Sequence, residues 1–135
     1  MSGRLDWTEF FFSSAGRLSR LPFMVSAGIL LTGAWLYQAV AAPPVGWITG
    51  LVVYPFLLFC GASVTAKRWH DRGRSGWWAL PVLAAVLATW NPWAPGALRF
   101  LSSLFLVWAA IELCAMPGEQ GLNRFGPNPM APAHA

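Results

Sequence analysis

Residues 21–66 have the sequence LPFMVSAGILLTGAWLYQAVAAPPVGWITGLVVYPFLLFCGASVTA, which contains no Asp, Glu, Lys or Arg. The strongest helix break within it is Pro43-Pro44, followed by Gly46. Each half is long enough to cross a hydrocarbon core of about 30 Å at roughly 1.5 Å per residue. The stretch therefore predicts two membrane-spanning helices, residues 21–42 and 46–66, joined by a tight turn.

Two more apolar runs follow along the chain. Residues 76–90 end at Asn91-Pro92, and residues 97–116 end before Pro117-Gly118, where turn formers stop a helix. We therefore expect four transmembrane helices within a domain of residues 21–116. The run 76–90 is short for a span, which indicates a helix that tilts little or thins the bilayer locally.

The composition agrees with a membrane protein. The chain has 135 residues, of which 56% are hydrophobic and 10% are charged. Soluble domains carry about 25% charged residues, so this chain lacks the polar side chains needed to cover a water-facing surface. An all-α membrane protein is predicted, and a disordered chain is excluded. Because Cys60 and Cys114 are the only cysteines, a disulfide scaffold is excluded too.

A cleaved signal peptide is the competing interpretation of the first span. Ala39-Val40-Ala41 fits the small-residue pattern of a cleavage site. The apolar stretch is longer than a usual signal peptide core, however, and a proline pair follows almost at once. We expect an uncleaved first helix.

The positions of the basic residues predict the orientation. With a cytoplasmic N-terminus, one residue, Arg99, lies outside and eight lie inside: Arg4, Arg17, Arg20, Lys67, Arg68, Arg72, Arg74 and Arg124. The positive-inside rule therefore predicts that both termini are cytoplasmic. The basic residues form short clusters between apolar runs and not one broad basic face, so nucleic acid is not an expected partner.

Two cytoplasmic segments flank the spans. In residues 1–20, a short helix with Phe10, Phe11 and Phe12 is too apolar for water and too short to span, which predicts that it lies in the inner membrane interface. Residues 117–135 are rich in Gly, Pro and Asn, which predicts an irregular tail.

The segment 67–78, KRWHDRGRSGWW, combines four cations with three indoles. Guanidinium groups match the geometry of phosphate, and indoles anchor at headgroup depth. We therefore expect a basic, Trp-rich cytoplasmic rim that binds anionic lipid headgroups or a partner protein. Its candidate residues are Arg17, Arg20, Arg68, Trp69, His70, Asp71, Arg72, Arg74, Trp77, Trp78, Asn123 and Arg124. The alternative is that these cations only set the orientation.

Three motifs together resemble a known family. They are GRLSR at residues 16–20, RWHDRGRSGWW at residues 68–78 and NRFGPNP at residues 123–129. The combination resembles the bacterial inner-membrane family called domain of unknown function 805, over nearly the whole chain. The resemblance implies a small four-helix protein of the inner (plasma) membrane. It brings no established activity, cofactor or catalytic residue.

Glu112 is the only acidic residue within an apolar run, and such a carboxylate is costly in a membrane. One interpretation is a small oligomeric transporter that uses Glu112 as its coupling carboxylate. The favoured interpretation is an ion pair with one of four cations, because Glu112 lies near the cytoplasmic end of its helix. Those cations are Arg17, Arg20, Lys67 and Arg68.

His70-Asp71 is the remaining candidate for chemistry, as an acid–base pair or half of a metal site. Adjacent helical residues point in different directions, so the favoured role is structural, with Asp71 capping a helix or pairing with an arginine. We expect no enzyme, no metal and no cofactor. The expected partners are the bilayer, anionic lipids, and a second copy or another membrane protein.

Overall fold

The computed structural model describes residues 7–130, and helices form the regular structure of this part apart from one β-bridge between Asn123 and Gly126. In chain order the helices are α1 (Trp7–Phe12), α2 (Arg20–Val40), α3 (Val45–Asp71), η1 (Gly76–Trp78), α4 (Ala79–Trp90), α5 (Gly96–Ala110) and η2 (Ile111–Ala115). η1 is a 3₁₀ turn, and η2 is a π-helical turn that continues α5. The prediction of an all-α protein is confirmed for the described residues.

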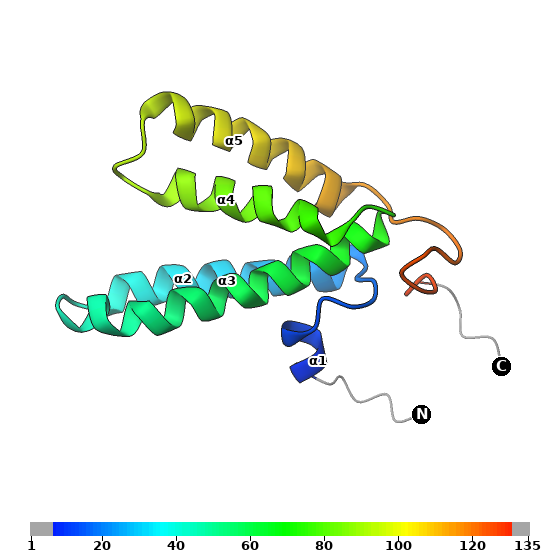
Figure 1. Ribbon diagram of the computed structural model, residues 1–135, viewed down its shortest axis with the longest axis horizontal. Coiled ribbons are helices and arrows are strands. Elements are labelled where there is room, and N and C mark those ends of the chain that lie inside the picture. Colours follow the sequence, from blue (N-terminus) through cyan, green and yellow to red (C-terminus); the bar gives the residue numbers. More distant parts are fainter. Residues whose placement is uncertain (1–6, 131–135) are drawn as a thin grey trace.

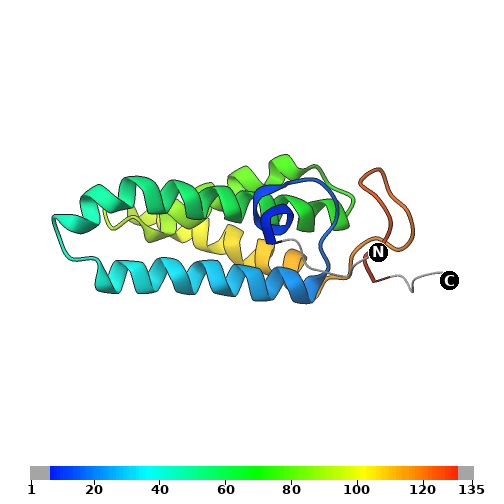
Figure 2. The same ribbon diagram turned by 90° about the horizontal axis from the view of Figure 1, so that it is seen from below.

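The long helices form two antiparallel hairpins, α2 with α3 and α4 with α5 (Figure 1). The hairpins meet where α3 ends, through contacts of α3 with η1 and α4 and of α2 with η2. They diverge towards the α2–α3 and α4–α5 turns, which gives the molecule a V shape (Figure 1). α1 and the described tail lie towards the end where α3 stops (Figure 2). We call this the basic end, and the opposite end the open end.

Three helices are apolar and long enough to cross a membrane: Arg20–Val40, Val45–Asp71 and Gly96–Ala115, the last combining α5 with η2. Their most apolar windows have mean hydropathies between 1.5 and 1.8. The fourth apolar helix, Gly76–Trp90, is shorter, in agreement with the short run in the sequence. These helices identify a multi-pass membrane protein. The fourth crossing stays a prediction.

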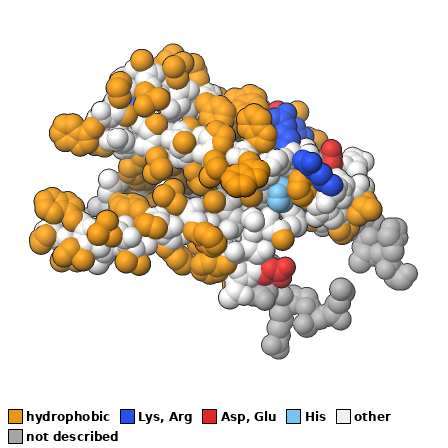
Figure 3. Space-filling model, in the orientation of Figure 1, with side chains coloured by type: hydrophobic (Ala, Val, Ile, Leu, Met, Phe, Trp, Pro, Cys, Tyr) orange, Lys and Arg blue, Asp and Glu red, His pale blue; other side chains and the backbone are white. Residues whose placement is uncertain are grey.

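Large hydrophobic side chains cover the outside of the hairpins (Figure 3). Leu51 and Val52 on α3 are 78% and 72% exposed, and many others along the helices are similar. Water would disfavour such a surface by about 25 cal/mol per Å² of apolar area, whereas lipid chains solvate it. The Lys and Arg side chains visible in this view gather mostly at the basic end (Figure 3).

α3 is longer than the sequence predicts, because it ends at Asp71 and not at Ala66. The sequence analysis ended the membrane span at residue 66 and treated residues 67–78 as a cytoplasmic segment. In the structure residues 67–71 continue the helix, and the cations among them find acceptors on neighbouring segments. The helical turn directs Arg68 and Trp69 into the protein interior, where both are fully buried.

Gly73 ends α3. Its φ of +72° is a left-handed conformation that glycine adopts without a Cβ clash. The N–H of Gly73 donates to the carbonyl of His70, and the N–H of Arg74 donates to the carbonyl of Trp69, at 3.0 and 2.9 Å. This is the Schellman pattern, which satisfies carbonyls at the end of a helix.

The buried core lies at the basic end, where the two hairpins meet. Its members are Leu18, Phe23, Val64, Trp69, Val82, Ala109 and Leu113. They come from α2, α3, α4, α5, η2 and the segment before α2, so a single cluster joins both hairpins. The hairpins are therefore packed against each other at one end only.

An apolar cleft of about 670 Å³ separates the hairpins between this core and the open end. α2 and α3 form one wall, and α4, α5 and η2 form the other; we call this the inter-hairpin cleft. The cleft opens to the outside between the helices, and its apolar walls are disfavoured in water and solvated by lipid chains.

Candidate functional site

Asp71, the last residue of α3, holds two arginines at the basic end. Its carboxylate accepts a hydrogen bond from Nε of Arg17, at 3.0 Å, and one from Nη1 of Arg68. All three side chains are at most 4% exposed. We call Arg17, Arg68 and Asp71 the arginine cluster. Asp71 thus takes the arginine-paired role, one of the two that the sequence analysis favoured.

The carboxylate of Asp71 cannot bind all the N–H groups of two guanidiniums. Backbone carbonyls accept hydrogen bonds from the remaining N–H groups of the arginine cluster. Arg68 donates to the carbonyls of Leu18, Leu113 and Met116, at 3.4, 2.6 and 2.6 Å. Arg17 donates to the carbonyls of Glu119, Gly121 and Gly126. Buried charges are tolerated when they are paired and fully hydrogen-bonded. The cluster therefore fastens the segment before α2, the end of α3, η2 and the tail to one another.

Glu112 forms an ion pair with Arg72, at 2.6 Å between Oε2 and Nη2. Both side chains are largely buried, and Arg72 also donates to the carbonyl of Pro117 at 2.5 Å. The sequence analysis expected one of four other cations as the partner. Arg72 takes the place because the longer α3 brings its C-cap next to η2.

Lys67 attaches α1 to α3. Its Nζ donates to the carbonyls of Glu9 and Phe10, at 2.8 and 2.7 Å, and lies 5.3 Å from the centre of the Phe10 ring. The last turn of a helix exposes carbonyls with no partner inside the helix, and a cation is favourable there. The lysine therefore serves as a docking contact for the short aromatic helix.

Trp69 lies in the core, although the sequence analysis placed it at the membrane interface. It is 0% exposed and packs against Trp78 and Trp108, with ring centres 5.9 and 6.0 Å away. The guanidinium of Arg74 lies 5.6 to 6.0 Å from the centres of these three rings, within cation–π range. Trp77, in contrast, is 76% exposed, as an interfacial anchor requires.

His70 and Asp71 point to different partners, so they form no acid–base pair. Asp71 faces the arginine cluster, whereas Nδ1 of His70 lies 2.9 Å from the carbonyl oxygen of Gly16. The His70 ring stacks on Phe125 of the tail at 3.9 Å. Within residues 7–130, no group of three His, Cys, Asp or Glu side chains is arranged to hold a metal ion.

A second cavity, of about 520 Å³, lies beside His70; we call it the interfacial pocket. The pocket forms because several of the residues of α3 and α4 that line it are small, Ala62 among them. Ser14, His70 and Ser75 supply polar atoms at its basic-end side, while Phe59 and Leu80 lie deeper along α3 and α4. Along α3, the pocket runs about 16 Å from Phe59 to His70, at 1.5 Å per residue. Most of its polar side chains lie towards the basic end, beside Trp77 and Phe125, while in the deeper half the hydroxyl of Ser63 donates to the carbonyl of Phe59 within α3.

The free nitrogen of His70 belongs to this pocket. A carbonyl only accepts, so Nδ1 carries the hydrogen that binds Gly16, and Nε2 is left without a partner among the described residues. A Cβ added to Gly76 would lie 2.8 Å from Nε2, which explains the need for glycine beside the imidazole. Arg124 lies 4.6 Å from the centre of the Phe125 ring, and no carboxylate lines the pocket.

The structure divides the candidate rim residues into three groups. Side chains turned inward belong to Arg17, Arg68, Trp69 and Asp71. Those bound to neighbouring protein groups near the surface are Arg20, Arg72 and Asn123. Those exposed or lining the interfacial pocket are His70, Trp77, Trp78 and Arg124. Arg74, which is half-buried against three indole rings, belongs with the second group. Of the six candidate arginines, four therefore bind acceptors within the protein: Arg17, Arg20, Arg68 and Arg72.

The sequence analysis missed the walls of the interfacial pocket. Ser14, Ser75 and Phe125 come from three segments that meet only in the folded protein. Phe125 lies within the NRFGPNP motif, and that clustering of an aromatic with turn formers is the one local signal for the pocket. The Gln38 to Trp90 hydrogen bond of 2.8 Å, between α2 and α4, was missed as well, because neither residue is unusual in its own segment.

Comparisons with known proteins agree with the resemblance drawn from the three motifs. The family model described as "Protein of unknown function (DUF805)" matches residues 1–127. Two proteins named "Uncharacterized protein YiiR", from Escherichia coli strain K12 and from Escherichia coli O157:H7, are each 36% identical over 126 residues. The alignments cover 87% of this chain and 86% of theirs. No solved structure matches the chain. The chain belongs to the DUF805 family of proteins of unknown function.

Proposed function

We propose that this is a four-span inner-membrane protein with both termini in the cytoplasm. The antiparallel hairpins support this topology, because α1 and the tail lie towards the same end of the molecule (Figure 2). Gly76–Trp90 is apolar throughout, and α4 packs along α5. Of the eight Lys and Arg residues within residues 7–130, all but Arg99 lie towards the basic end of this arrangement.

The orientation is tested by cysteine labelling in whole cells, in a Cys60→Ala, Cys114→Ala background. An impermeant thiol reagent should react with Ala42→Cys and with Ala94→Cys, in the two turns of the open end. It should react with Gln120→Cys, in the tail, only after the membrane is opened. Labelling of Gln120→Cys in intact cells would reverse the orientation, and protection of Ala94→Cys would remove the third and fourth crossings.

We further propose that the basic end binds the headgroup of an anionic phospholipid in the interfacial pocket. The observation that carries this proposal is the polarity gradient of the pocket, which matches an amphiphile at headgroup depth. Its polar end offers the hydroxyls of Ser14 and Ser75, which can donate to a phosphate, and Nε2 of His70, which accepts a hydrogen bond from a hydroxyl of the headgroup. Arg124 beside the stacked Phe125 favours an anion there. The deep, apolar end accommodates the start of an acyl chain.

This proposal narrows the predicted rim. Arg74 and Arg124 contribute positive potential, worth about 1 kcal/mol each near an anionic surface. Arg17, Arg68 and Arg72 are not available to bind a headgroup, because they already donate hydrogen bonds to acceptors within the protein. Simple enforcement of orientation by the same cations is the alternative. In this proposal the protein is a binding protein and not an enzyme.

The pocket is tested by filling it. Ala62→Phe places a ring in the pocket, whereas Ala84→Phe adds the same ring at an exposed site on α4 that lines neither cavity. The proteins are purified from membranes of phosphatidylglycerol and phosphatidylcholine, and the retained lipid is measured by native mass spectrometry. Ala62→Phe should lose the preference for phosphatidylglycerol, Arg124→Gln should weaken it, and Ala84→Phe should keep it. Equal preference in all four proteins would leave only the orientation role.

The coupling role of Glu112 in a small oligomeric transporter is the competing proposal. The 2.6 Å contact with Arg72 supports the structural role instead, because the carboxylate already has a cationic partner. Proton-driven flux in vesicles that is lost in Glu112→Gln, without a loss of stability, would favour the transporter.

A further inference from the structure

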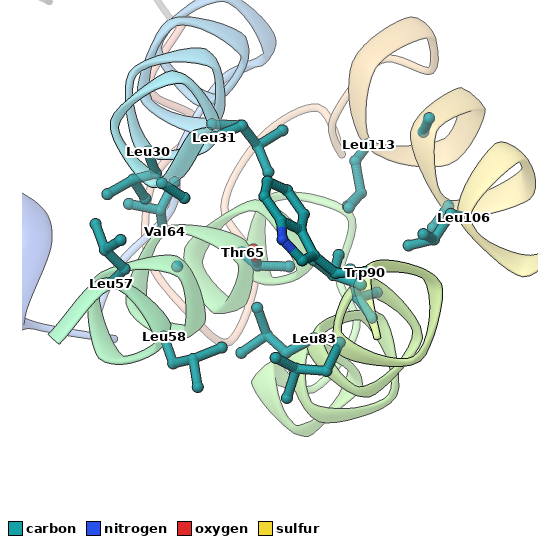
Figure 4. Close-up of a pocket in the computed structure, with 18 of the residues that line it drawn as sticks. Leu30, Leu31, Leu57, Leu58, Val64, Thr65, Leu83, Trp90, Leu106 and Leu113 are labelled. Carbon is teal, nitrogen blue, oxygen red and sulfur yellow. The ribbon is translucent and has the colours of Figure 1, made fainter. Parts of the chain in front are cut away.

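The inter-hairpin cleft is a second cavity, separate from the interfacial pocket. Its walls face each other across the V, with leucines from both hairpins pointing into the space (Figure 4). Leu30 and Leu57 lie on one wall, and Leu83 and Leu106 lie on the other. No residue lines both cavities, so the two can be altered independently.

The lining of the cleft is almost entirely apolar. No Asp, Glu, Lys, Arg or His lines it, and its few polar residues lie mainly near its ends. Gln38 and Asn91 lie at the open end, and Thr65 lies towards the core at the basic end. A water molecule needs two to four polar partners in a buried site, and the middle of this cleft provides none. The occupant is therefore a hydrocarbon.

The volume of the cleft suits a small or narrow ligand. About 670 Å³ falls within the range of pockets that hold single small ligands, about 300–1,000 Å³. A helix with its side chains is about 10 Å wide, whereas an acyl chain is a single file of methylene groups, so the acyl chain needs the smaller opening between the hairpins.

The position of the cleft places it next to the acyl chains of the membrane. It lies between helices that are long and apolar enough to cross the membrane, so its open side faces the hydrocarbon layer. The core closes its inner end, where Val64 and Leu113 line it. We propose that the inter-hairpin cleft is a binding site for one acyl chain of a membrane lipid, which enters sideways from the hydrocarbon layer.

Trp90 closes part of the cleft at the open end. Its indole N–H donates to Oε1 of Gln38, at 2.8 Å, which bridges α4 to α2 across the open end. The ring reaches into the middle of the space towards Leu31 (Figure 4). The indole thus covers the chain from the open end, and the lipid headgroup lies at the level of this polar pair.

Photo-crosslinking tests the proposal. The probe is a phosphatidylcholine with a diazirine near the end of one acyl chain, incorporated into nanodiscs with the full-length protein. Adducts are mapped by peptide mass spectrometry. In the parent, Leu57 and Leu83 in the cleft should be labelled more strongly than Leu51, an exposed residue of α3 that lines no cavity. A zwitterionic probe is used because the cleft offers no charge to a headgroup.

Two variants of α2 give the control. Ala34→Phe fills the cleft, and Ala39→Phe adds the same ring at an exposed position outside it. Labelling in the cleft should fall about tenfold in Ala34→Phe, the change that about 1.4 kcal/mol of lost binding free energy produces, and should stay at the parental level in Ala39→Phe. Melting temperatures show whether both variants are folded. If Ala34→Phe unfolds, Ala110→Leu, on the opposite wall and outside the core, narrows the cleft instead.

Three outcomes would overturn the proposal: equal labelling of Leu51 and Leu57, unchanged labelling in a folded cleft-filling variant, or cross-links in the cleft that join two protein chains. The third would identify a second copy as the occupant. None of them bears on the interfacial pocket, because Ala62→Phe and the preference for phosphatidylglycerol test that site separately.

Discussion

The two ends of this molecule are held together by different means. At the basic end, buried ion pairs and hydrogen bonds to carbonyls join segments distant in sequence. At the open end, the hydrogen bond from Trp90 to Gln38 is the only one between side chains of the two hairpins within residues 7–130. The contrast teaches that the two hairpins associate where polar contacts join them beside the packed core, and not where both facing walls are only apolar.

The physical reason lies in the solvent. Lipid chains are as apolar as leucine, so burying leucine against leucine gains little in a membrane. A polar group buried without a partner is costly, by contrast, so its contacts hold the helices in place. The hairpins therefore stay together where Asp71 and the arginines are, and diverge where both facing walls are apolar.

The largest effect is expected at the arginine cluster. Asp71→Asn leaves Arg17 and Arg68 buried without a counter-charge, which should lower the free energy of unfolding by about 3–5 kcal/mol. The measurement is unfolding in mixed detergent micelles. The control is Glu119→Gln, an exposed carboxylate whose change should stay within about 0.5 kcal/mol. Equal stability of the two variants would show that the basic end is not fastened by charge.

The next effect concerns the ion pair of Glu112 and Arg72. Either single change to glutamine should cost about 1.5–3 kcal/mol, the value of a hydrogen bond to a charged group, because the pair is mostly buried. The double variant should lose less than the sum of the two, and a double-mutant cycle of unfolding free energies measures the difference. Strict additivity would mean that the two side chains do not interact.

Gly73→Ala tests the end of α3. An alanine at φ of +72° is strained by about 1–2 kcal/mol, and its Cβ would also meet the carboxylate of Glu119. Gly96→Ala is the control, since the space around it is open and its φ is ordinary. Unfolding of both variants in the same micelles gives the comparison. An unchanged free energy of unfolding in Gly73→Ala would indicate that α3 does not end in a left-handed residue at position 73.

The smallest effect is expected at the open end. Trp90→Phe removes the hydrogen bond to Gln38 and should cost about 0.5–1.5 kcal/mol. Amide hydrogen exchange should accelerate at the open end of α2, around residues 36–40. Trp93→Phe, at an indole that is 91% exposed, should change neither quantity. A cost in Trp90→Phe as large as that of Asp71→Asn would abolish the distinction between the two ends.

Hydrophobic pattern was enough to predict the helices. The uncharged run from Leu21 to Ala66 and its proline pair placed α2 and the start of α3 within a few residues. The end of α3 was wrong, because Arg68 looks like a loop residue until its acceptors are known. Those acceptors, the carbonyls of Leu113 and Met116, lie 45 and 48 residues away in the sequence. No local pattern reports them.

The same limit applies to the site. The three motifs together predicted correctly which family the chain belongs to. They did not predict which of their residues point inward, because burial depends on the tail and η2. Trp69 and Trp77 are identical in type and eight residues apart, yet one is fully buried and the other is 76% exposed.

The acceptors of Arg17 have a consequence for biosynthesis. They are the carbonyls of Glu119, Gly121 and Gly126, near the end of the chain, whereas Arg17 is made near the beginning. Chains are synthesised from the N-terminus at about 5–20 residues per second, so Arg17 waits several seconds for its partners. During that interval its charge is free to act on the insertion machinery and the lipid surface. Once the tail arrives, the same charge is enclosed, and a signal for topology becomes part of the protein interior.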